Sequence, residues 1–290
     1  MKVLIFGATG MLGYSLFTNL SDYKHLHVFG TVRNVNEKER FFKNLEHKLI
    51  EHVDVTEIAS IEHAIQQVSP DVVLNCVGLI KQHDVSKQNV SAIEINSLLP
   101  HKLASLCNKH NAQLIHFSTD CVFDGQKGNY TESDLPTATD LYGKSKCLGE
   151  VNYDRHITLR TSIIGHELVT SVSLIDWFLS QNGEVNGFSK AIFSGLPTSY
   201  IAKILVDNVF EKTDLTGLYH LSVEPIDKFS LVSLVAEIYG KEITINPSAD
   251  LVIDRSLDST RFRELTGFVP PTWRELVEYM RKDYLKRYTS

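Results

Sequence analysis

Short apolar runs separated by longer amphipathic stretches give the chain a repeating pattern. The runs that read as strands are residues 3–6, 27–32, 72–77, 114–117, 157–160 and 218–222. Between them, residues 58–68 and 95–107 place their apolar positions at close to helical spacing. Strands that alternate with helices are joined by right-handed βαβ crossovers, so the pattern predicts a doubly wound, parallel α/β sheet.

The first predicted strand runs directly into a glycine-rich turn. The stretch GATGMLG, residues 7–13, lies between a strand and a helix, which is the context that a dinucleotide-binding motif needs. Gly7 permits a tight turn, Gly10 lets the backbone approach a pyrophosphate, and Gly13 lets the helix pack closely on the sheet. A glycine turn without a ligand is the alternative. The motif favours a Rossmann-type fold whose cofactor-binding residues here are Gly7, Thr9, Gly10, Met11, Leu12 and Gly13.

The ends of later strands indicate how a dinucleotide would be held. Arg33 follows the second strand, where a cofactor without a 2′-phosphate normally meets an acidic residue, so we expect NADPH, with NADH as the alternative. A solvent-exposed arginine without a ligand is the competing interpretation. From their spacing along the chain, we expect Asp54 and Val55 to contact the adenine half of the cofactor. Cys76, Val77 and Gly78 should flank its nicotinamide half.

The alternation weakens after about residue 160, which predicts a second, smaller lobe. Residues 173–181, SLIDWFLSQ, read as a helix, and residues 229–239 and 272–284 are mainly helical in pattern. We divide the chain into a dinucleotide-binding domain, 1–161 plus about 195–223, and a mainly helical substrate-binding lobe, about 162–194 plus 224–290. No linker-like segment separates them, so the lobes should pack closely.

Composition narrows the function classes. The 290 residues carry 35 acidic and 29 basic side chains without a basic cluster, so we expect no nucleic-acid partner. Four widely spaced cysteines form no CxxC pair, which indicates neither a zinc site nor a disulfide framework. The opening MKVLIFG is too short for a signal peptide and no run reaches membrane-spanning length, so we expect a cytoplasmic protein without a membrane partner.

Candidate catalytic residues lie in the stretches HFSTDCVFDG and YGKSKCLGE. Tyr142 and Lys146 are four residues apart and share one face of a helix. A free tyrosine, with a pKa of about 10, is a poor proton donor at neutral pH, and a nearby ammonium should lower that pKa. Thr119, at the end of the preceding strand, is placed to hydrogen-bond the same oxygen. Two surface helix residues are the competing interpretation of a lone YxxxK pattern.

The stretches GATGMLG, NCVG, STDCVFDG, YGKSK and LRTS together resemble the extended short-chain dehydrogenases/reductases. FSTDCVFDGQKGNYTESD and YGKSKCLGE are similar to the branch that contains the dTDP-4-dehydrorhamnose reductases. The similarity continues through GLPTSY, YHLS and LDSTRFRELTGFVPPTW, and so covers most of the chain. The core motifs are specific to the superfamily and less specific to one substrate.

The resemblance implies NADPH-dependent reduction of the 4-keto group of a nucleotide-linked 6-deoxysugar, in deoxysugar or surface polysaccharide biosynthesis. Thr119, Tyr142 and Lys146 match the family's catalytic triad, and Asn96 matches an asparagine that helps hold the lysine and its water. Thr119 would orient the keto oxygen, Tyr142 would protonate it, and Lys146 would also hold the nicotinamide ribose. Some relatives use magnesium through glutamates at a dimer interface; no matching set is evident, so we predict no metal and leave a homodimer open.

One departure separates this chain from the related sugar-nucleotide 4,6-dehydratases. Those enzymes carry an Asp-Glu pair directly after the threonine, whereas the pair here is Asp120-Cys121. A thiol is a poor substitute for that carboxylate, so dehydration is disfavoured. We expect Cys121 to be a packed residue rather than a nucleophile.

Three functions stay open. A reductase of a UDP-2-acetamido-2,6-dideoxy-4-ketohexose would use the same catalytic residues. A non-catalytic NADP-binding regulatory subunit is the alternative from another class, because a relative in this branch serves methionine adenosyltransferase in that way.

The second lobe offers several candidate contacts for the nucleotide sugar, and none of them is preferred over an ordinary core or surface position. They are Arg160, Trp177, Lys190, Arg261 and residues 193–200.

Overall fold

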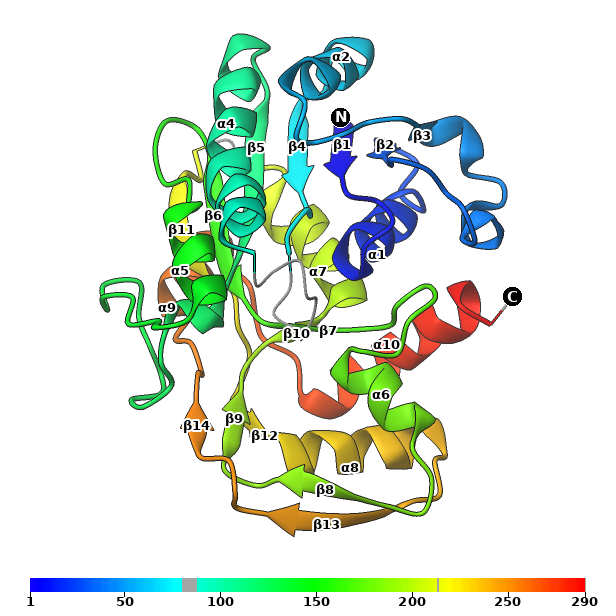
Figure 1. Cartoon of the computed structure of the whole chain (residues 1–290), viewed down its shortest axis with the longest axis vertical. Helices are drawn as coiled ribbons and strands as arrows, with labels where there is room; N and C mark the ends of the chain where they lie inside the picture. Colours follow the sequence, from blue (N-terminus) through cyan, green and yellow to red (C-terminus); the bar gives the residue numbers. More distant parts are fainter. Residues whose placement is uncertain (80–87, 213, 290) are drawn as a thin grey trace.

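A seven-stranded parallel sheet forms the centre of the molecule (Figure 1). The computed structural model describes residues 1–79, 88–212 and 214–289. The strand order is β11-β6-β5-β4-β1-β2-β3, which confirms the doubly wound α/β sheet. Of the seven strands in this sheet, the apolar runs predicted all except the two-residue strand β3. The strands are β1 (Lys2–Phe6), β2 (His27–Thr31), β3 (Leu49–Ile50), β4 (Val72–Asn75), β5 (Gln113–Thr119), β6 (Ile157–Thr161) and β11 (Gly217–His220).

Helices cover both faces of this sheet, which is why its strands read as continuous apolar runs. In β1, Val3 and Ile5 pack in a core with α1 and α7, whereas Leu4 and Phe6 pack in a second core with α2 and α4. The helix expected at residues 58–68 is confirmed in full. The elements around the sheet are α1 (Met11–Leu20), α2 (Ile58–Val68), α3 (Asn89–Ala92), α4 (Leu99–Lys109), α5 (Leu141–Leu148), α7 (Thr198–Ile204), α9 (Thr260–Thr266), the π-helices η4 (Ile93–Leu98) and η6 (Leu205–Val209), and the 3-10 helices η1 (Glu39–Phe42), η2 (Glu46–Lys48) and η5 (Asp120–Val122).

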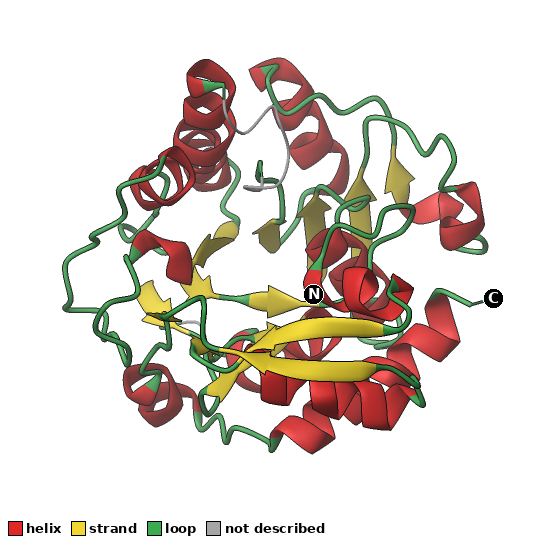
Figure 2. Cartoon of the chain, turned by 60° about the horizontal axis from the view of Figure 1, so that its bottom comes forward, coloured by secondary structure: helices red, strands yellow, loops and turns green. Residues whose placement is uncertain are grey.

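The second lobe combines helices with small sheets. Its core includes Phe178, Phe193, Leu231 and Val277, and β8 and β13 run parallel beside each other (Figure 2). The expectation of a mainly helical lobe missed these short strands, because several are only two or three residues long. The elements are α6 (Leu174–Ser180), α8 (Lys228–Tyr239), α10 (Trp273–Arg287), β8 (Glu184–Phe188), β9 (Ala191–Phe193), β12 (Ile226–Asp227), β13 (Thr244–Ser248) and β14 (Ile253–Asp254), with β7 (Ile163–Ile164) and β10 (Leu196–Pro197) paired nearby.

The C-terminal helix α10 joins the two lobes. Leu276 packs in the core beside the large sheet, whereas Val277 packs in the core of the second lobe. Asp283 accepts a hydrogen bond from Asn19 of α1 at 3.0 Å, and Arg287 pairs with Asp22 at 2.6 Å. The expected domain boundaries stay a prediction, since one helix serves both cores.

Candidate active site

The turn between β1 and α1 can be built only with glycine at two positions. Gly7 has a φ of +88°, which side chains rarely permit. A Cβ on Gly13 would lie 2.0 Å from the carbonyl oxygen of Gly7, so any larger residue would collide with the backbone. A Cβ on Gly10 would meet only that same oxygen, at 3.5 Å, so the turn is open on the Gly10 side.

The start of α1 fits the phosphates of a dinucleotide. The helix has no side-chain cap and no acidic residue in its first turn, so its backbone N–H groups and dipole favour an anion. Gly10 is exposed and Thr9 and Met11 are partly buried at this end. Leu12 is buried in the core, so only its backbone can face a ligand.

The structure brings Arg33 and Asp54 close together beyond the ends of β2 and β3. Arg33 is exposed. The N–H and hydroxyl of Thr56 donate to Oδ1 of Asp54 at 2.9 and 2.8 Å. These bonds, and then the charge of Arg33, lower the pKa of Asp54. A cation and a carboxylate therefore stand together at this edge of the sheet, with Val55 partly buried against the core beside them, and their contact with the adenosine half of a cofactor stays a prediction.

The segment after β4 is held against both the glycine turn and α5. Val77 Cγ2 lies 3.0 Å from the place of a Cβ on Gly7, and Lys146 Nζ lies 4.0 Å from the place of a Cβ on Gly78. Burial raises the pKa of Cys76 strongly, so its thiol stays protonated. Residues 76–78 thus lie between the glycine turn and Lys146, and their contact with the nicotinamide stays a prediction.

Thr119, Tyr142 and Lys146 come together where β5 ends beside α5. Asp140 caps α5 by accepting the N–H of Gly143 at 2.9 Å. A Cβ on Gly143 would lie 2.2 Å from the carbonyl oxygen of Cys121, so the helix rests directly on the turn after Thr119. Thr119 and Lys146 are 7% and 5% exposed. This close packing brings the Tyr142 phenol to the Thr119 hydroxyl, and the Lys146 amine to the carbonyl of Phe117 on the same strand.

Asn96 lies on the π-helix η4 and is buried. Its Oδ1 accepts the N–H of Leu79 at 2.9 Å, and its Nδ2 donates to the carbonyl of Leu79 at 3.1 Å and to Ser145 Oγ at 3.2 Å. Among the described residues it has no hydrogen bond to Lys146 itself. Asn96 therefore supports the lysine through the neighbouring Ser145 and holds the segment after β4 in place.

Burial governs protonation in the site. It raises the pKa of Tyr142, as does the nearby Cys121, although a hydrogen bond with Thr119 lowers it. Burial lowers the pKa of Lys146 to about 8, against the opposing charge of Glu150. The expectation that Lys146 lowers the pKa of Tyr142 is wrong for this structure, because desolvation of the buried phenolate dominates and Lys146 is not among the main groups that shift this pKa.

Arg160 is held in a buried ion pair with Glu150. Its Nε and NH2 donate to the two carboxylate oxygens of Glu150, each at 2.7 Å, and the pair is buried. Ser118 donates to the same carboxylate at 2.7 Å, which explains this hydroxyl at the strand end. Arg261 donates to the carbonyl of Leu218 at 3.3 Å, and a role for it in substrate binding stays a prediction.

Sequence reasoning missed Arg255. Its Nε donates to the carbonyl of Phe123 at 2.9 Å, and its NH1 lies 3.6 Å from the sulfur of Cys121. Burial raises the pKa of Cys121 to about 12, which favours the protonated thiol and agrees with the expectation of a packed residue. Arg255 comes from the second lobe and is 134 residues from Cys121 along the chain, so no local sequence pattern could indicate this contact.

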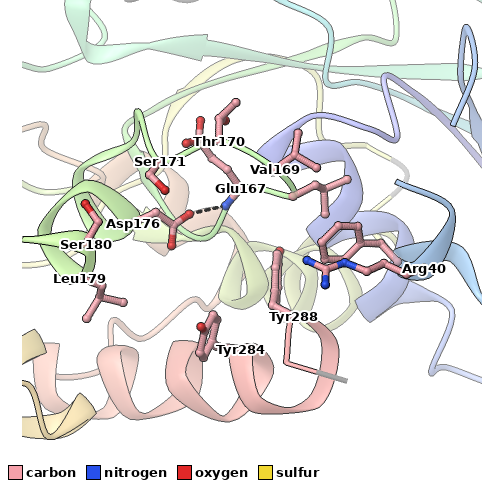
Figure 3. Close-up of a pocket in the computed structure, with 12 residues that line it drawn as sticks. Arg40, Glu167, Val169, Thr170, Ser171, Asp176, Leu179, Ser180, Tyr284 and Tyr288 are labelled. Carbon is pink, nitrogen blue, oxygen red and sulfur yellow. Dashed lines mark hydrogen bonds between the residues drawn. The ribbon is translucent and has the colours of Figure 1, made fainter. Parts of the chain in front are cut away.

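A polar cavity of about 390 Å³ lies apart from these residues. Figure 3 shows Tyr284 of α10 and Tyr288, the residue after its end, on one side, Arg40 at one end, and Glu167 and Asp176 facing them. None of the predicted catalytic or cofactor residues lines it. Across residues 1–79, 88–212 and 214–289, no helix is long and apolar enough to cross a membrane, and no three His, Cys, Asp or Glu side chains are grouped to hold a metal.

Comparisons with known proteins cover nearly all of the chain. The model of the family described as the RmlD substrate binding domain matches residues 1–286. A dTDP-4-dehydrorhamnose reductase from Aggregatibacter actinomycetemcomitans is 24% identical over 97% of this chain and 98% of that one. The beta subunit of methionine adenosyltransferase 2 from Xenopus tropicalis is 30% identical over 82% of this chain and 72% of that one. A probable low-salt glycan biosynthesis reductase, Agl14 of Haloferax volcanii, is 30% identical, but the match spans only 52% of this chain and 48% of that protein.

Solved structures share the fold. The dTDP-4-dehydrorhamnose reductase of Bacillus anthracis, in complex with NADP, has a TM-score of 0.77 at 20% identity and covers 97% of this chain and 99% of that one. WbmG of Bordetella bronchiseptica, in complex with NAD, has a TM-score of 0.77 at 19% identity and covers 99% of this chain and 94% of that one. The fold therefore accommodates NADP in one relative and NAD in another.

Proposed function

The chain belongs to the RmlD substrate binding domain family, and from that membership we propose that it is an NADPH-dependent reductase of the 4-keto group of a nucleotide-linked 6-deoxysugar. The observation that carries the proposal is the meeting of Thr119, Tyr142 and Lys146 at the end of β5, on the sheet edge that also holds the glycine turn. Open α/β sheets bind ligands at this edge.

The residues at the sheet edge fit NADPH. The uncapped start of α1 would hold the pyrophosphate, and Arg33 would face the 2′-phosphate. NADPH, when bound, would supply the hydride for the keto carbon. NADH is the alternative cofactor, and comparison of the two is part of the test below.

The side chains would handle the keto oxygen and its proton. The Thr119 hydroxyl would hydrogen-bond that oxygen and orient it. Tyr142 would give its phenolic proton to the oxygen as charge develops there; the raised pKa of Tyr142 keeps that proton in place until it is needed. The Lys146 amine, held by the carbonyl of Phe117 at 2.7 Å, would hold the nicotinamide ribose of the cofactor.

Dehydration is disfavoured by the same geometry. A dehydratase needs a second acid directly after the first one, and Cys121 stands there with its pKa raised to about 12 by burial. A simple reduction needs no group at this position.

The assay is NADPH absorbance decay with purified protein and a panel of dTDP-linked and UDP-linked 4-keto sugars, the UDP-linked 4-keto-2-acetamido sugars included. We expect turnover with at least one sugar, and a loss of 10²-fold or more in Tyr142→Phe with NADPH affinity unchanged. Turnover with only the UDP-2-acetamido sugars would select that alternative substrate. Equal turnover in wild type and Tyr142→Phe would contradict the catalytic assignment.

A non-catalytic NADP-binding subunit is the second candidate, because subunits of methionine adenosyltransferase 2 are among the relatives. Under that function the protein would bind NADPH tightly and turn over no sugar of the panel. Tyr142→Phe would then change cofactor affinity at most. Co-elution with methionine adenosyltransferase 2 catalytic subunits in gel filtration would support this function in place of the reductase.

A further inference from the structure

His116 is a buried histidine that reaches the candidate site from inside β5. Its Nδ1 lies 3.1 Å from Nδ2 of Asn75, at the end of β4. Its Nε2 lies 3.5 Å from Nζ of Lys146 on α5. The three side chains are 0%, 1% and 5% exposed for His116, Asn75 and Lys146. They form a buried row that ends at the amine.

The hydrogen bonds of Asn75 determine which ring nitrogen carries the proton. The backbone N–H of Val77 donates to Oδ1 of Asn75 at 3.1 Å, which orients the amide so that its NH2 group faces His116. An amide NH2 can only donate, so Nδ1 of His116 must accept. Burial, then the charges of Lys146 and His101, lower the pKa of His116 well below its ordinary value. The ring is therefore neutral, and its one proton is on Nε2.

The Nε2–H group consequently points at the Lys146 amine. An ammonium has only donors, so two donors face each other at 3.5 Å when Lys146 is charged, whereas a neutral amine offers a lone pair. We propose that His116 is a positioning residue that places the Lys146 amine and favours release of its proton. The inference rests on the proposed reductase function and adds a residue that tunes its proton chemistry.

The other groups around Lys146 act in different ways. The carbonyl of Phe117 on β5 accepts its N–H at 2.7 Å and fixes the position of the amine. Glu150, just beyond α5, and Cys76, after β4, favour the ammonium, while burial disfavours it. Among these groups His116 is the one whose hydrogen-bonding pattern opposes the charge. It therefore helps to set the pH at which the amine can both give and take a proton.

The first test needs neither cofactor nor sugar. In protein labelled with ¹⁵N-histidine, we expect the His116 ring, identified by its loss in His116→Phe or His116→Gln, to be neutral between pH 6 and pH 9 with its proton on Nε2. A proton on Nδ1, or a ring that titrates in this range, would overturn the proposal. Because the tautomer is measured in the wild type, a structural effect of a substitution cannot imitate this result.

The second test follows Lys146 itself. With ¹³Cε-lysine labelling and Lys146→Met to assign the signal, we expect a titration midpoint near pH 8 in the wild type. His116→Phe keeps the ring but offers no N–H, so the midpoint should rise by about one pH unit, a tenfold gain in proton affinity. His116→Gln, whose amide oxygen can face the amine, should raise it as well and replaces the Phe variant if that one does not fold.

His156→Phe is the matched control. His156 is also fully buried, and its nitrogens bond the backbone of Leu114 and Ala104, not Lys146. Its replacement should lower stability and leave the Lys146 midpoint in place. An unchanged midpoint in a folded His116 variant would contradict the proposal. A shifted midpoint together with no turnover across the sugar panel would contradict the proposed function and leave the link between His116 and Lys146 intact.

Discussion

The amine of Lys146 donates a hydrogen bond to the backbone carbonyl of Phe117 at 2.7 Å. This bond ties α5 to β5, the strand that ends at Thr119. A helix whose side chain is anchored inside the strand cannot slide along it, so the spacing between Tyr142 and Thr119 is held by the fold. The predictions below test the groups that hold this arrangement.

Removal of the buried amine should change how stability depends on pH. Burial lowers the pKa of Lys146 from 10.5 to about 8. Between these values the unfolded chain binds a proton that the folded chain does not, so this group makes the protein more stable as pH rises from 8 to 10.5. The full difference is about 3 kcal/mol. Lys146→Met should lose this rise in urea unfolding at pH 7, 8, 9 and 10.

Lys144→Met provides the control, because Lys144 lies on the same helix and is exposed. Its unfolding free energy should follow the wild-type curve at every pH. Parallel curves for Lys146→Met and wild type would show that the amine is not titrating in this window.

The glycine turn can be tested with two matched substitutions. Gly13→Ala places a Cβ 2.0 Å from the carbonyl oxygen of Gly7, and should lower stability by about 1–3 kcal/mol or more and weaken NADPH binding. Gly10→Ala meets only one atom, at 3.5 Å, so it should leave the thermal midpoint nearly unchanged while it weakens cofactor binding. Equal midpoints for the two variants would contradict the packing described at Gly13.

Arg33→Ala tests the choice of cofactor. A charge-assisted bond to the 2′-phosphate is worth about 1.5–3 kcal/mol, so the KM for NADPH should rise about tenfold or more. The KM for NADH should change less than twofold, since that cofactor lacks the phosphate. An equal change in KM for both cofactors, measured in parallel assays, would contradict the placement of Arg33 beside the 2′-phosphate.

The buried pair of Glu150 and Arg160 should matter for stability. Glu150→Gln leaves the Arg160 charge buried without its partner, which costs about 3–5 kcal/mol when a buried pair is broken. Glu237→Gln, at the exposed pair with Arg274, should shift the thermal midpoint little. Similar shifts of the thermal midpoint for both variants in calorimetry would mean that burial does not make the Glu150–Arg160 pair more important for stability than the exposed pair.

Much of the fold could be predicted from local pattern. The run at residues 3–6 and the helix at residues 58–68 were placed correctly because apolar spacing reports which faces are buried. Gly13 was recognised because its close contact with Gly7 follows from strand, turn and helix within one short stretch. The two-residue strand β3 and the small sheets of the second lobe were missed, because such short strands leave no periodic signal.

Local sequence pattern was enough to assign residues to one element: Tyr142 and Lys146 to one face of α5, and Thr119 to the end of β5. The distant groups that meet them became visible only in the packed chain. His116 faces Lys146, Arg255 reaches Cys121, and Arg160 turns away to Glu150. Burial then set the pKa values, raising that of Tyr142 and lowering that of Lys146. Desolvation and long-range contacts depend on the packed environment of a side chain, and no spacing along the chain encodes that directly.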